Sequence, residues 1–395
     1  MSNTTTGAWE TEIADRAQLF LDKKPLYRQL ANFRMQGIMK RGREVNRPIF
    51  TPGQLSFEDY TPNAAITATD WTYTQEKMTV NVEKACRLKT DPFEELDLQI
   101  AGHRALLADR LIQAGERTLD QAFLAEVSNA ALDVDDSDFG GTASDPINLT
   151  TNPVEDVWGQ AFAELTHNVG EGERLYTVID AFQLEKIANR AIEATYQLSD
   201  KYFEKYVGKT FKGFDLYLSN NLPTSFTLTY TGTGTNAVDF RIGGITFHQV
   251  TTIGSTAGNV LMATNATTCA TNVKNFLNAP GTTSANQVAL SSANQDRLRN
   301  AGVVATSAAG VVTVTGYGRL QPKYVTTDAN ASFSDESIST LCGVYKNIDM
   351  VVQMAPTVKI RGHDDNIGES FMGTIRAATK TYADGAQRTL KILTQ

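Results

Sequence analysis

The residue types that most often bind metals or catalyse reactions are few and scattered in this chain. No histidines or cysteines share the spacing of a zinc site such as HExxH or CxxC. The residues in question are His103, His167, His248, His363, Cys86, Cys269 and Cys342. An odd number of distant cysteines also favours a reducing compartment without a disulfide framework. We therefore predict no metal site, and we expect His103 to face a polar groove or a neighbour.

Two stretches match known motifs in part of their residue pattern, but not in the features on which the motifs depend. The GTGTNA of Gly232–Ala237 resembles a dinucleotide fingerprint, but the following VDFRIGG is typical of a strand, whereas the motif requires a helix. We therefore interpret it as a hairpin turn. DVDDSDFGG, from Asp133, alternates carboxylates as a calcium loop does, yet Asp138 stands where glycine is needed and Ser144 where glutamate is needed. A solvated acidic loop is favoured, and a weak cation site stays open.

No catalytic arrangement emerges from the remaining residues. The chain has no GxSxG elbow, no Walker lysine and no cysteine with a plausible partner. The GHDDN of residues 362–366 could hold acid and base groups, but its glycine and aspartates between two strand patterns indicate a turn. We predict that the protein is not an enzyme and uses no cofactor.

Composition and charge narrow the class of protein further. The 395 residues are 41% hydrophobic and 20% charged, as in ordinary globular proteins, and the net charge of -8 argues against a basic nucleic-acid coat. The N-terminus is polar and acidic, and no apolar run approaches the roughly 18 to 20 residues of a membrane span. We expect a protein made and kept in the cytoplasm, without membrane contact.

Positive charge is concentrated near the N-terminus. The cations of residues 23–47 are Lys23, Lys24, Arg28, Arg34, Lys40, Arg41, Arg43 and Arg47. Loose helical periodicity over residues 9–41 predicts an arm with weak helices. Two interpretations stay open for this basic run: a solvated, mobile tail, or a segment that lies against phosphate or an acidic partner.

Residues 50–90 predict a long β-ribbon with a loose tip, because strand-like alternation is broken by Pro52, Gly53 and Pro62. Ordering a residue costs about 1 to 2 kcal/mol, and an isolated two-stranded hairpin is marginal in water. The ribbon must therefore lie on its own domain or contact another subunit.

The strongest helix signal follows the ribbon. Asp91, Pro92 and Glu94 form a capping box with proline at the first helical position, and an apolar stripe continues to Val127. This pattern predicts a spine helix of roughly 50 Å. Residues 154–223 then predict an α+β module, which ends in the strand GFDLYLSNNLP closed by Asn220, Asn221 and Pro223.

A shift in composition marks the next part of the chain. Residues 224–327 hold only eight charged residues in 104 positions. Strand patterns occur at FTLTY, ITFHQV and GVVTVTGYG, and short helices fit TNATTCATNVKNFLN and SANQDRLRN. We therefore predict a β-rich inserted domain, after which the chain alternates as strands to its end.

The order of these elements resembles the major capsid protein of tailed bacteriophages, which has the Hong Kong 97-type fold. AGERTLDQAFLAEV is similar to the end of that family's spine helix, and GERLYTVIDAFQLEKI to the strand and helix of its axial domain. KGFDLYLSNNLP is similar to a strand end of the axial domain, and MAPTVKIRG with GESFMGTIRAATKTY to the closing peripheral strands. The resemblance covers about residues 9–222 and 336–395.

The resemblance implies an α+β fold with seven parts. These are an N-terminal arm (1–49), an extended loop (50–90), a peripheral domain with the spine helix (91–153), an axial domain (154–223), an inserted domain (224–333), an axial return (334–355) and peripheral C-terminal strands (356–395).

Roles for single residues are implied in the same way. Inter-subunit contacts of the extended loop would come from Phe57, Tyr60, Trp71 and Tyr73. The interior-facing basic arm would hold Arg34, Lys40, Arg41, Arg43 and Arg47. Some family members cross-link through a lysine on this loop, but residues 48–76 contain no Lys or Arg, so we predict no covalent chain-mail. No helical scaffold segment precedes the arm, which implies a separate scaffolding protein or none.

The implied function is a structural virion protein that assembles with itself. Hexamers and pentamers would form an icosahedral shell around double-stranded DNA, assembled in the host cytoplasm, with portal and decoration proteins as further partners. Two alternatives stay open. One is an encapsulin-like nanocompartment, which the large insert and the basic arm oppose, and the other is a glycan-binding protein or enzyme that acts through the insert.

Overall fold

The computed structural model describes residues 25–39, 42–50, 62, 73–90, 103–170, 172–194, 210–262, 265–362 and 369–395. The chain divides into two compact units. The first combines Met1–Ala131 with Val344–Arg388, and the second combines Leu132–Gly343 with Thr389–Gln395. The first unit is therefore closed by a segment that returns from late in the sequence.

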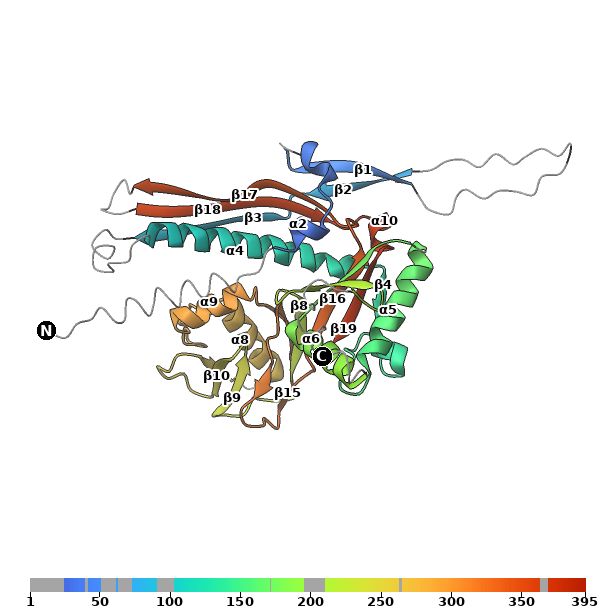
Figure 1. Cartoon of the computed structure of the whole chain (residues 1–395). Helices are drawn as coiled ribbons and strands as arrows, with labels where there is room; N and C mark the ends of the chain where they lie inside the picture. The colour runs from blue at the N-terminus through green and yellow to red at the C-terminus, as the bar shows by residue number, and fades with distance from the viewer. Residues whose placement is uncertain are drawn as a thin grey trace. The chain divides into compact units, whose positions relative to one another are not determined.

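A three-stranded antiparallel sheet with one long helix forms the body of the first unit (Figure 1). The strands are β17 (Asp349–Gly362), β18 (Glu369–Lys380) and β3 (Val82–Thr90), with β18 in the middle. Helix α4 (His103–Ala125) runs along one face of this sheet and continues as the 3-10 helix η2 (Glu126–Asn129). The predicted spine helix is confirmed over this range, whereas its capping box at Asp91 lies outside the described residues.

Close packing between α4 and the sheet depends on a glycine. A Cβ atom on Gly115 would lie 2.8 Å from the Cβ of Pro356, which is closer than real Cβ atoms approach. Phe371 and Ala377 of β18 are fully buried, as is Phe123 of α4. The helix therefore covers one sheet face with side chains in van der Waals contact.

The ribbon differs in its bounds from the prediction. Strands β1 (Glu44–Phe50) and β2 (Tyr73–Thr79) pair antiparallel from Glu44 opposite Thr79 to Phe50 opposite Tyr73. The ribbon thus begins in the basic run, before residue 50. Residues 82–90 are not part of it, because β3 pairs with β18 over its whole length. Strand alternation alone does not distinguish a ribbon from an adjacent sheet strand.

Part of the predicted arm is packed. Within residues 25–39, the expected weak helices are the short helices α2 (Tyr27–Leu30) and η1 (Arg34–Gly37). The side chains of Leu26, Tyr27 and Leu30 are buried. A mobile tail is therefore the wrong description of residues 26–39.

The second unit is built on one large mixed sheet. Its main path runs in the order β12, β13, β8, β16, β5, β7, β6, with β15, β19 and β4 paired at its side. The strands are β4 (Leu132–Val134), β5 (Leu175–Ile179), β6 (Thr210–Phe211), β7 (Phe214–Leu218), β8 (Pro223–Tyr230), β12 (Val304–Ala308), β13 (Val311–Tyr317), β15 (Ala331–Phe333), β16 (Ser337–Val344) and β19 (Thr389–Thr394). Helices α5 (Val154–Val169) and α6 (Ala181–Ala194) confirm the predicted α+β module.

The last strand belongs to a different sheet from the one predicted. β19 was expected among the peripheral strands of residues 356–395, but it pairs with β16 and β4 in the sheet of the second unit. The chain crosses from the first unit to the second after Arg388. Residue pattern predicts a strand at this position without indicating its neighbours.

The predicted insert shares a sheet with the module before it. Pro223 already belongs to β8, so the expected boundary at residue 224 falls inside a strand, and β8 pairs with β16 as well as β13. A second sheet follows the order β11 (Asn259–Leu261), β10 (Ile245–Val250), β9 (Val238–Ile242), β14 (Lys323–Tyr324). GTGTNA is not a hairpin turn, because it connects β8 and β9, which lie in different sheets.

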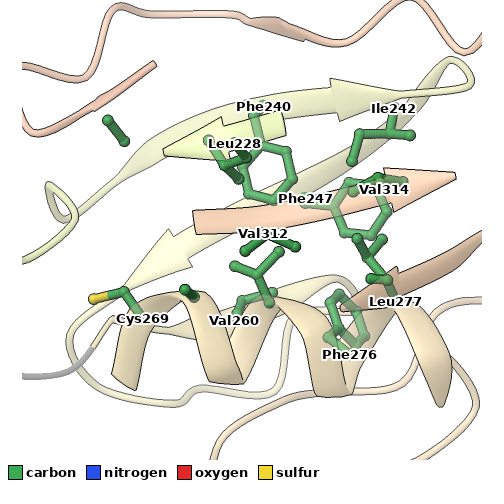
Figure 2. Close-up of a cluster of buried hydrophobic side chains, with 14 of the residues drawn as sticks. Leu228, Phe240, Ile242, Phe247, Val260, Cys269, Phe276, Leu277, Val312 and Val314 are labelled. Atoms are coloured by element: carbon green, nitrogen blue, oxygen red, sulfur yellow. The ribbon is translucent and has the colours of Figure 1, made fainter. Parts of the chain in front are cut away.

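A core of its own lies between these two sheets and helices α8 (Ala266–Asn278) and α9 (Ser292–Asn300). Figure 2 shows Phe240 and Phe247 from neighbouring strands above Phe276 of α8. The rings of Phe240 and Phe247 are stacked at 5.1 Å, and Phe276 meets Phe247 edge-on at 5.4 Å. These aromatic contacts stabilise the hydrophobic core of this segment, which contains few charged residues.

The turn that ends GFDLYLSNNLP is held by the chain's return from this core. The Gly318 N–H donates to the Leu222 carbonyl at 2.8 Å. Gly318 has a φ of 75°, and a Cβ there would lie 2.6 Å from the Asn220 carbonyl oxygen. The entry and exit strands of residues 224–317 therefore meet at one glycine.

Replacing Phe123 by Ala is expected to lower the stability of the subunit by about 3 to 5 kcal/mol, because a fully buried aromatic side chain leaves a cavity. Thermal unfolding followed by circular dichroism measures the shift. Phe162→Ala is the matched control, since the Phe162 side chain is 39% exposed and its loss should cost about 1 kcal/mol. Equal shifts for the two variants would contradict the assigned burial.

Candidate functional site

The base of the ribbon has an inward and an outward face. Val45 and Met78 are directly opposite each other and face inward, where Met78 is fully buried. They join a cluster formed by Met35, Met39, Met78, Val351, Ala378 and Tyr382. Glu44 and Lys77 form an ion pair on the outward face, where both are about half exposed. The ribbon is thus anchored on a methionine-rich pad.

Arg47 forms the next inward layer of the ribbon. Its guanidinium donates to the Asp384 carboxylate at 2.8 Å and lies 3.4 Å from the Asp349 carboxylate. It also lies 4.8 Å from the centre of the Tyr382 ring, a cation–π distance. Burial raises the pKa of Asp349 although Arg47 opposes this, and it raises the pKa of Tyr382 to about 12. Arg47 and Asp349 are therefore poorly solvated, whereas Asp384 is partly exposed.

Glu76, directly opposite Arg47, holds the same neighbouring segment from the other ribbon strand. Its carboxylate accepts the Ala383 N–H at 3.2 Å and lies 4.0 Å from the Lys380 ammonium. We call Arg47, Glu76, Asp349 and Asp384 the ribbon lock. Both strands of the ribbon are thereby tied to residues 380–384 at one level.

The sheet face opposite α4 carries a mixed cationic and apolar surface. Register places Lys359, Met372 and Arg87 side by side across the three strands, on the face away from Gly373 and α4. Arg376 lies on the same face and pairs with Glu83 at 2.9 Å. Lys359 and Arg87 are exposed. We call this the outer face of the first unit.

The N-terminal segment closes part of the β17 edge. The Met350 N–H donates to the Asn32 carbonyl at 2.9 Å, so Asn32 acts as one residue of an added strand. Farther along, the Gln36 amide donates to the Val352 carbonyl at 2.6 Å and accepts the Val352 N–H at 2.8 Å. A side-chain amide here pairs with the backbone as a neighbouring strand would.

Two carboxylates on α4 hold the start of this segment. The Tyr27 N–H donates to Asp120 at 2.9 Å, and the Tyr27 hydroxyl donates to Glu116 at 2.6 Å. Arg28 forms an ion pair with Glu116. Burial raises the pKa of Asp120 to about 6, against the lowering effect of the backbone donors. The folded state as a whole therefore favours the protonated form of Asp120, whereas the Tyr27 N–H by itself favours the ionised form.

An ion pair connects the parts of the second unit. The Arg319 guanidinium donates to Asp180 at 2.5 Å and lies 4.2 Å from the centre of the Phe182 ring. Asp180 also accepts the Gln183 N–H at 2.7 Å, at the start of α6. The segment that leaves the inserted core is thus attached to the predicted axial module.

The acidic loop from Asp133 is only partly solvated. Asp135 is buried, and although burial opposes it, hydrogen bonds from Ser137 and Ser144 lower the pKa of Asp135. This carboxylate caps η3 (Asp136–Phe139) and is not free to bind a cation. The loop also borders a polar cavity of about 640 Å³. Hydroxyl groups and carboxylates dominate its lining, which includes Asp136, Asp145, Ser225, Thr227, Thr313 and Asp335.

Metal-ligating side chains are dispersed in the described part of the chain. Within it, no group of three or more His, Cys, Asp or Glu side chains could hold a metal ion. His248 pairs with Asp239 on the adjacent strand at 2.7 Å. His363 lies outside the described residues, as does the side chain of His103. Among the described helices, none is long and apolar enough to cross a membrane.

Only some of the predicted contact residues can be placed. Phe57, Tyr60 and Trp71 of the ribbon tip, and Lys40 and Arg41 of the basic arm, lie outside the described residues. Tyr73 begins β2. Arg34 begins η1 and is exposed, and Arg43 pairs with Glu83 at 3.0 Å. Arg47 is held in the ribbon lock, so its charge is already compensated within the subunit.

Sequence reasoning missed the polar residues that anchor the N-terminal segment and the ribbon. Asp120 and Glu116 follow each other one turn apart on the predicted spine helix, a spacing that indicates a shared face. Gln36 and Glu76 carry no such signal, because their partners are distant in sequence.

Comparisons with known proteins identify the fold. No protein-family model matches the chain, and no curated protein is similar to it in sequence. A solved structure from Mycobacterium phage Che8 matches with a TM-score of 0.50 and 11% identity, over 93% of this chain and 90% of the other. The capsid structure of the Cyanophage P-SCSP1u matches with a TM-score of 0.50 and 11% identity, over 95% of this chain and 89% of the other.

These likenesses show a shared fold at low sequence identity. The predicted α+β, Hong Kong 97-type fold class is confirmed, and the resemblance to phage major capsid proteins is confirmed at the level of the fold.

Replacing Asp120 by Asn should flatten part of the pH dependence of stability. Because the pKa of Asp120 rises from 3.8 to about 6 on folding, its contribution is fully present below about pH 4 and is lost as the pH rises through 6. The pH-dependent difference between wild type and variant should change by about 2 to 3 kcal/mol between pH 4 and 7.5. Chemical denaturation at several pH values measures it.

Wild type and Asp120→Asn share all other carboxylates, so the effect of those carboxylates on stability cancels in the difference between the two proteins. Asp109→Asn, at an exposed position on the same helix, controls for the loss of one carboxylate. Parallel profiles for wild type and Asp120→Asn would show that Asp120 titrates normally.

Proposed function

We propose that this protein is the major capsid subunit of a tailed bacteriophage, a structural virion protein that assembles into an icosahedral shell. The observation that carries the proposal is the fold shared with a cyanophage capsid structure over nearly the whole chain. Hexamers and pentamers of the subunit would enclose double-stranded DNA.

The free-energy cost of ordering the ribbon supports the proposal of assembly. Its base is packed on the methionine-rich pad, but two strands cannot supply a core for residues 51–72. Contacts from a neighbouring subunit would offset the cost of ordering them. We assign Phe57, Tyr60, Trp71 and Tyr73 to these contacts.

The outer face of the first unit has the chemistry to receive such a ribbon. It presents Lys359 and Arg87 around Met372. The tip carries Glu58, Asp59 and Asp70 without any Lys or Arg, together with large apolar side chains. Opposite charge and aromatic–sulfur contact favour the pair.

Basic residues near the N-terminus are proposed to face the interior. Arg34 is exposed, and Lys40 and Arg41 complete the group that could contact DNA phosphates without sequence preference. Arg43 and Arg47 contribute less, because carboxylates of the same chain pair with them. Assembly in the host cytoplasm, with a scaffolding protein or none and with portal and decoration proteins, completes the proposal.

Expression of the chain, alone and with a scaffolding protein from the same phage, followed by electron microscopy, tests this function. Closed shells are expected in at least one condition. Persistent monomers in both would count heavily against a shell subunit. Shells that enclose an enzyme and no DNA during infection would favour the nanocompartment alternative.

Deletion of Tyr60–Thr67 should leave a soluble, folded subunit and abolish shells, because we assign the tip to contacts between subunits. Size-exclusion chromatography and microscopy measure both properties. Replacing the same residues by Gly and Ser keeps the length and should fail in the same way. Normal shells from either variant would mean that the ribbon folds back on its own subunit.

Replacing Lys359 by Glu should raise the subunit concentration needed for assembly about tenfold, because it places like charges between the outer face and an incoming tip. Light scattering against concentration measures it. Lys323→Glu, an exposed site in the second unit, controls for net charge. If Glu58→Lys in the same chain restores assembly of Lys359→Glu, Glu58 is the residue that meets Lys359. If Lys359→Glu and Lys323→Glu raise the required concentration equally, the outer face does not receive the tip.

A further inference from the structure

The polar cavity beside the acidic loop has a floor of hydroxyl groups. On β8, Phe226 is buried in the inserted core, so its neighbours Ser225 and Thr227 point to the opposite face of the sheet. Register places Thr313 of β13 directly opposite Thr227. It also places Ser337 of β16 directly opposite Ser225. Three adjacent strands therefore present four hydroxyl groups side by side to the cavity.

The walls of the cavity are the loop after β4 and the connection between β15 and β16. They include Asp136, Asp145, Asn148, Thr151 and Asp335. The buried Asp135 carboxylate holds the loop, because it accepts the Ser144 N–H at 2.5 Å and the Ser137 N–H at 2.9 Å. The Ile147 N–H donates to the Leu393 carbonyl at 2.9 Å and so attaches the loop to β19. This wall is therefore formed before a ligand binds, which lowers the entropic cost of binding.

Many polar groups of the lining are available to a ligand. In the described part of the chain, the hydroxyls of Ser225, Thr227 and Thr313 form no hydrogen bond with another protein group. The carboxylates of Asp145 and Asp335 likewise form no hydrogen bond or ion pair within the described residues. A hydroxyl both donates and accepts, and a carboxylate accepts several hydrogen bonds. The cavity thus offers closely spaced donors and acceptors.

The chemistry of the lining narrows the class of ligand. Its charged side chains are all carboxylates, which repel phosphate, sulfate and acidic sugars. In the described part of the chain, these carboxylates do not form a group that could hold a metal ion. The ring of Phe226, the aromatic residue of the lining, is buried and cannot stack on a flat ligand. An apolar ligand would leave the hydroxyls and carboxylates unpaired. A neutral ligand with many hydroxyl groups fits best.

We propose that this cavity binds a glycan whose sugars carry no acidic group. Sugar hydroxyls can pair with the hydroxyls of the floor, and the wall carboxylates can accept pairs of sugar hydroxyls. The cavity volume of about 640 Å³ lies within the range of small-ligand sites and gives room for a short oligosaccharide. The site belongs to a single subunit and does not depend on the proposed function. A shell of such subunits would carry sugar-binding sites in addition to its structural role.

Titration of the full-length protein with trisaccharides tests this proposal. The neutral probes are cellotriose, maltotriose and mannotriose, which differ in the stereochemistry of their hydroxyls and linkages. Trigalacturonate is the acidic comparison, and spermidine is a cation without hydroxyls. Isothermal titration calorimetry measures the binding. At least one neutral probe should bind with a Kd of about 1 mM or tighter. Trigalacturonate should not bind, because the carboxylates of the lining repel it.

Two variants locate the binding in the cavity. Thr313→Val removes one floor hydroxyl, keeps a β-branched side chain and should raise the Kd about fivefold. Asp335→Asn should raise the Kd about tenfold, because a charged acceptor forms stronger hydrogen bonds. Thr306→Val is the matched control, since Thr306 of β12 lies directly opposite Thr313, is exposed and is not part of the cavity lining. This control should leave the Kd unchanged.

Failure of all three neutral probes to bind would overturn the proposal. Binding of spermidine without any neutral sugar would also overturn it, because the carboxylates would then attract cations only. Equal effects of Thr313→Val and Thr306→Val would place the sugar elsewhere. If Thr313→Val lowers the melting temperature, Asp335→Asn decides, since Asp335 is exposed. Shell formation is scored separately, so a chain that forms no shells would remove the proposed function and leave the measured binding intact.

Discussion

A two-stranded ribbon has no core of its own, and the first unit is organised around that constraint. Its body has a core apart from the ribbon, because α4 covers one face of a three-stranded sheet. The ribbon is then added through the methionine pad and the lock, which use side chains from β17, from residues 380–384 and from the N-terminal segment. Segments that are far apart in sequence are thus joined where the ribbon leaves the unit.

Local sequence patterns predicted most elements of this structure. The spine helix, α5, α6, α8, α9 and the strands of GFDLYLSNNLP and ITFHQV follow from periodicity, proline and glycine, which act over a few residues. The order of these elements was sufficient for the fold class. Pairing between distant strands was not predicted, because a strand pattern does not name its neighbour.

The errors share that physical origin. β19 was assigned to the wrong group of strands, and the ribbon was extended into β3, since both assignments require knowledge of the partner strand. The site shows the same limit. Arg47 was identified from a run of cations, but its role depends on Asp349 and Asp384, about three hundred residues away. A long-range ion pair leaves no trace in the spacing of either partner.

At two sheet edges, a side-chain amide forms the pair of backbone hydrogen bonds that a neighbouring strand would form. Gln36 pairs with Val352 at the edge of β17, and Asn278 of α8 pairs in the same way with Ala305 of β12, accepting its N–H at 2.9 Å and donating to its carbonyl at 2.8 Å. Each occupies backbone groups that another chain could otherwise bind. Unprotected strand edges can pair with other chains and grow into open-ended fibres. Two neutral side chains therefore protect part of two sheet edges against the addition of a further strand.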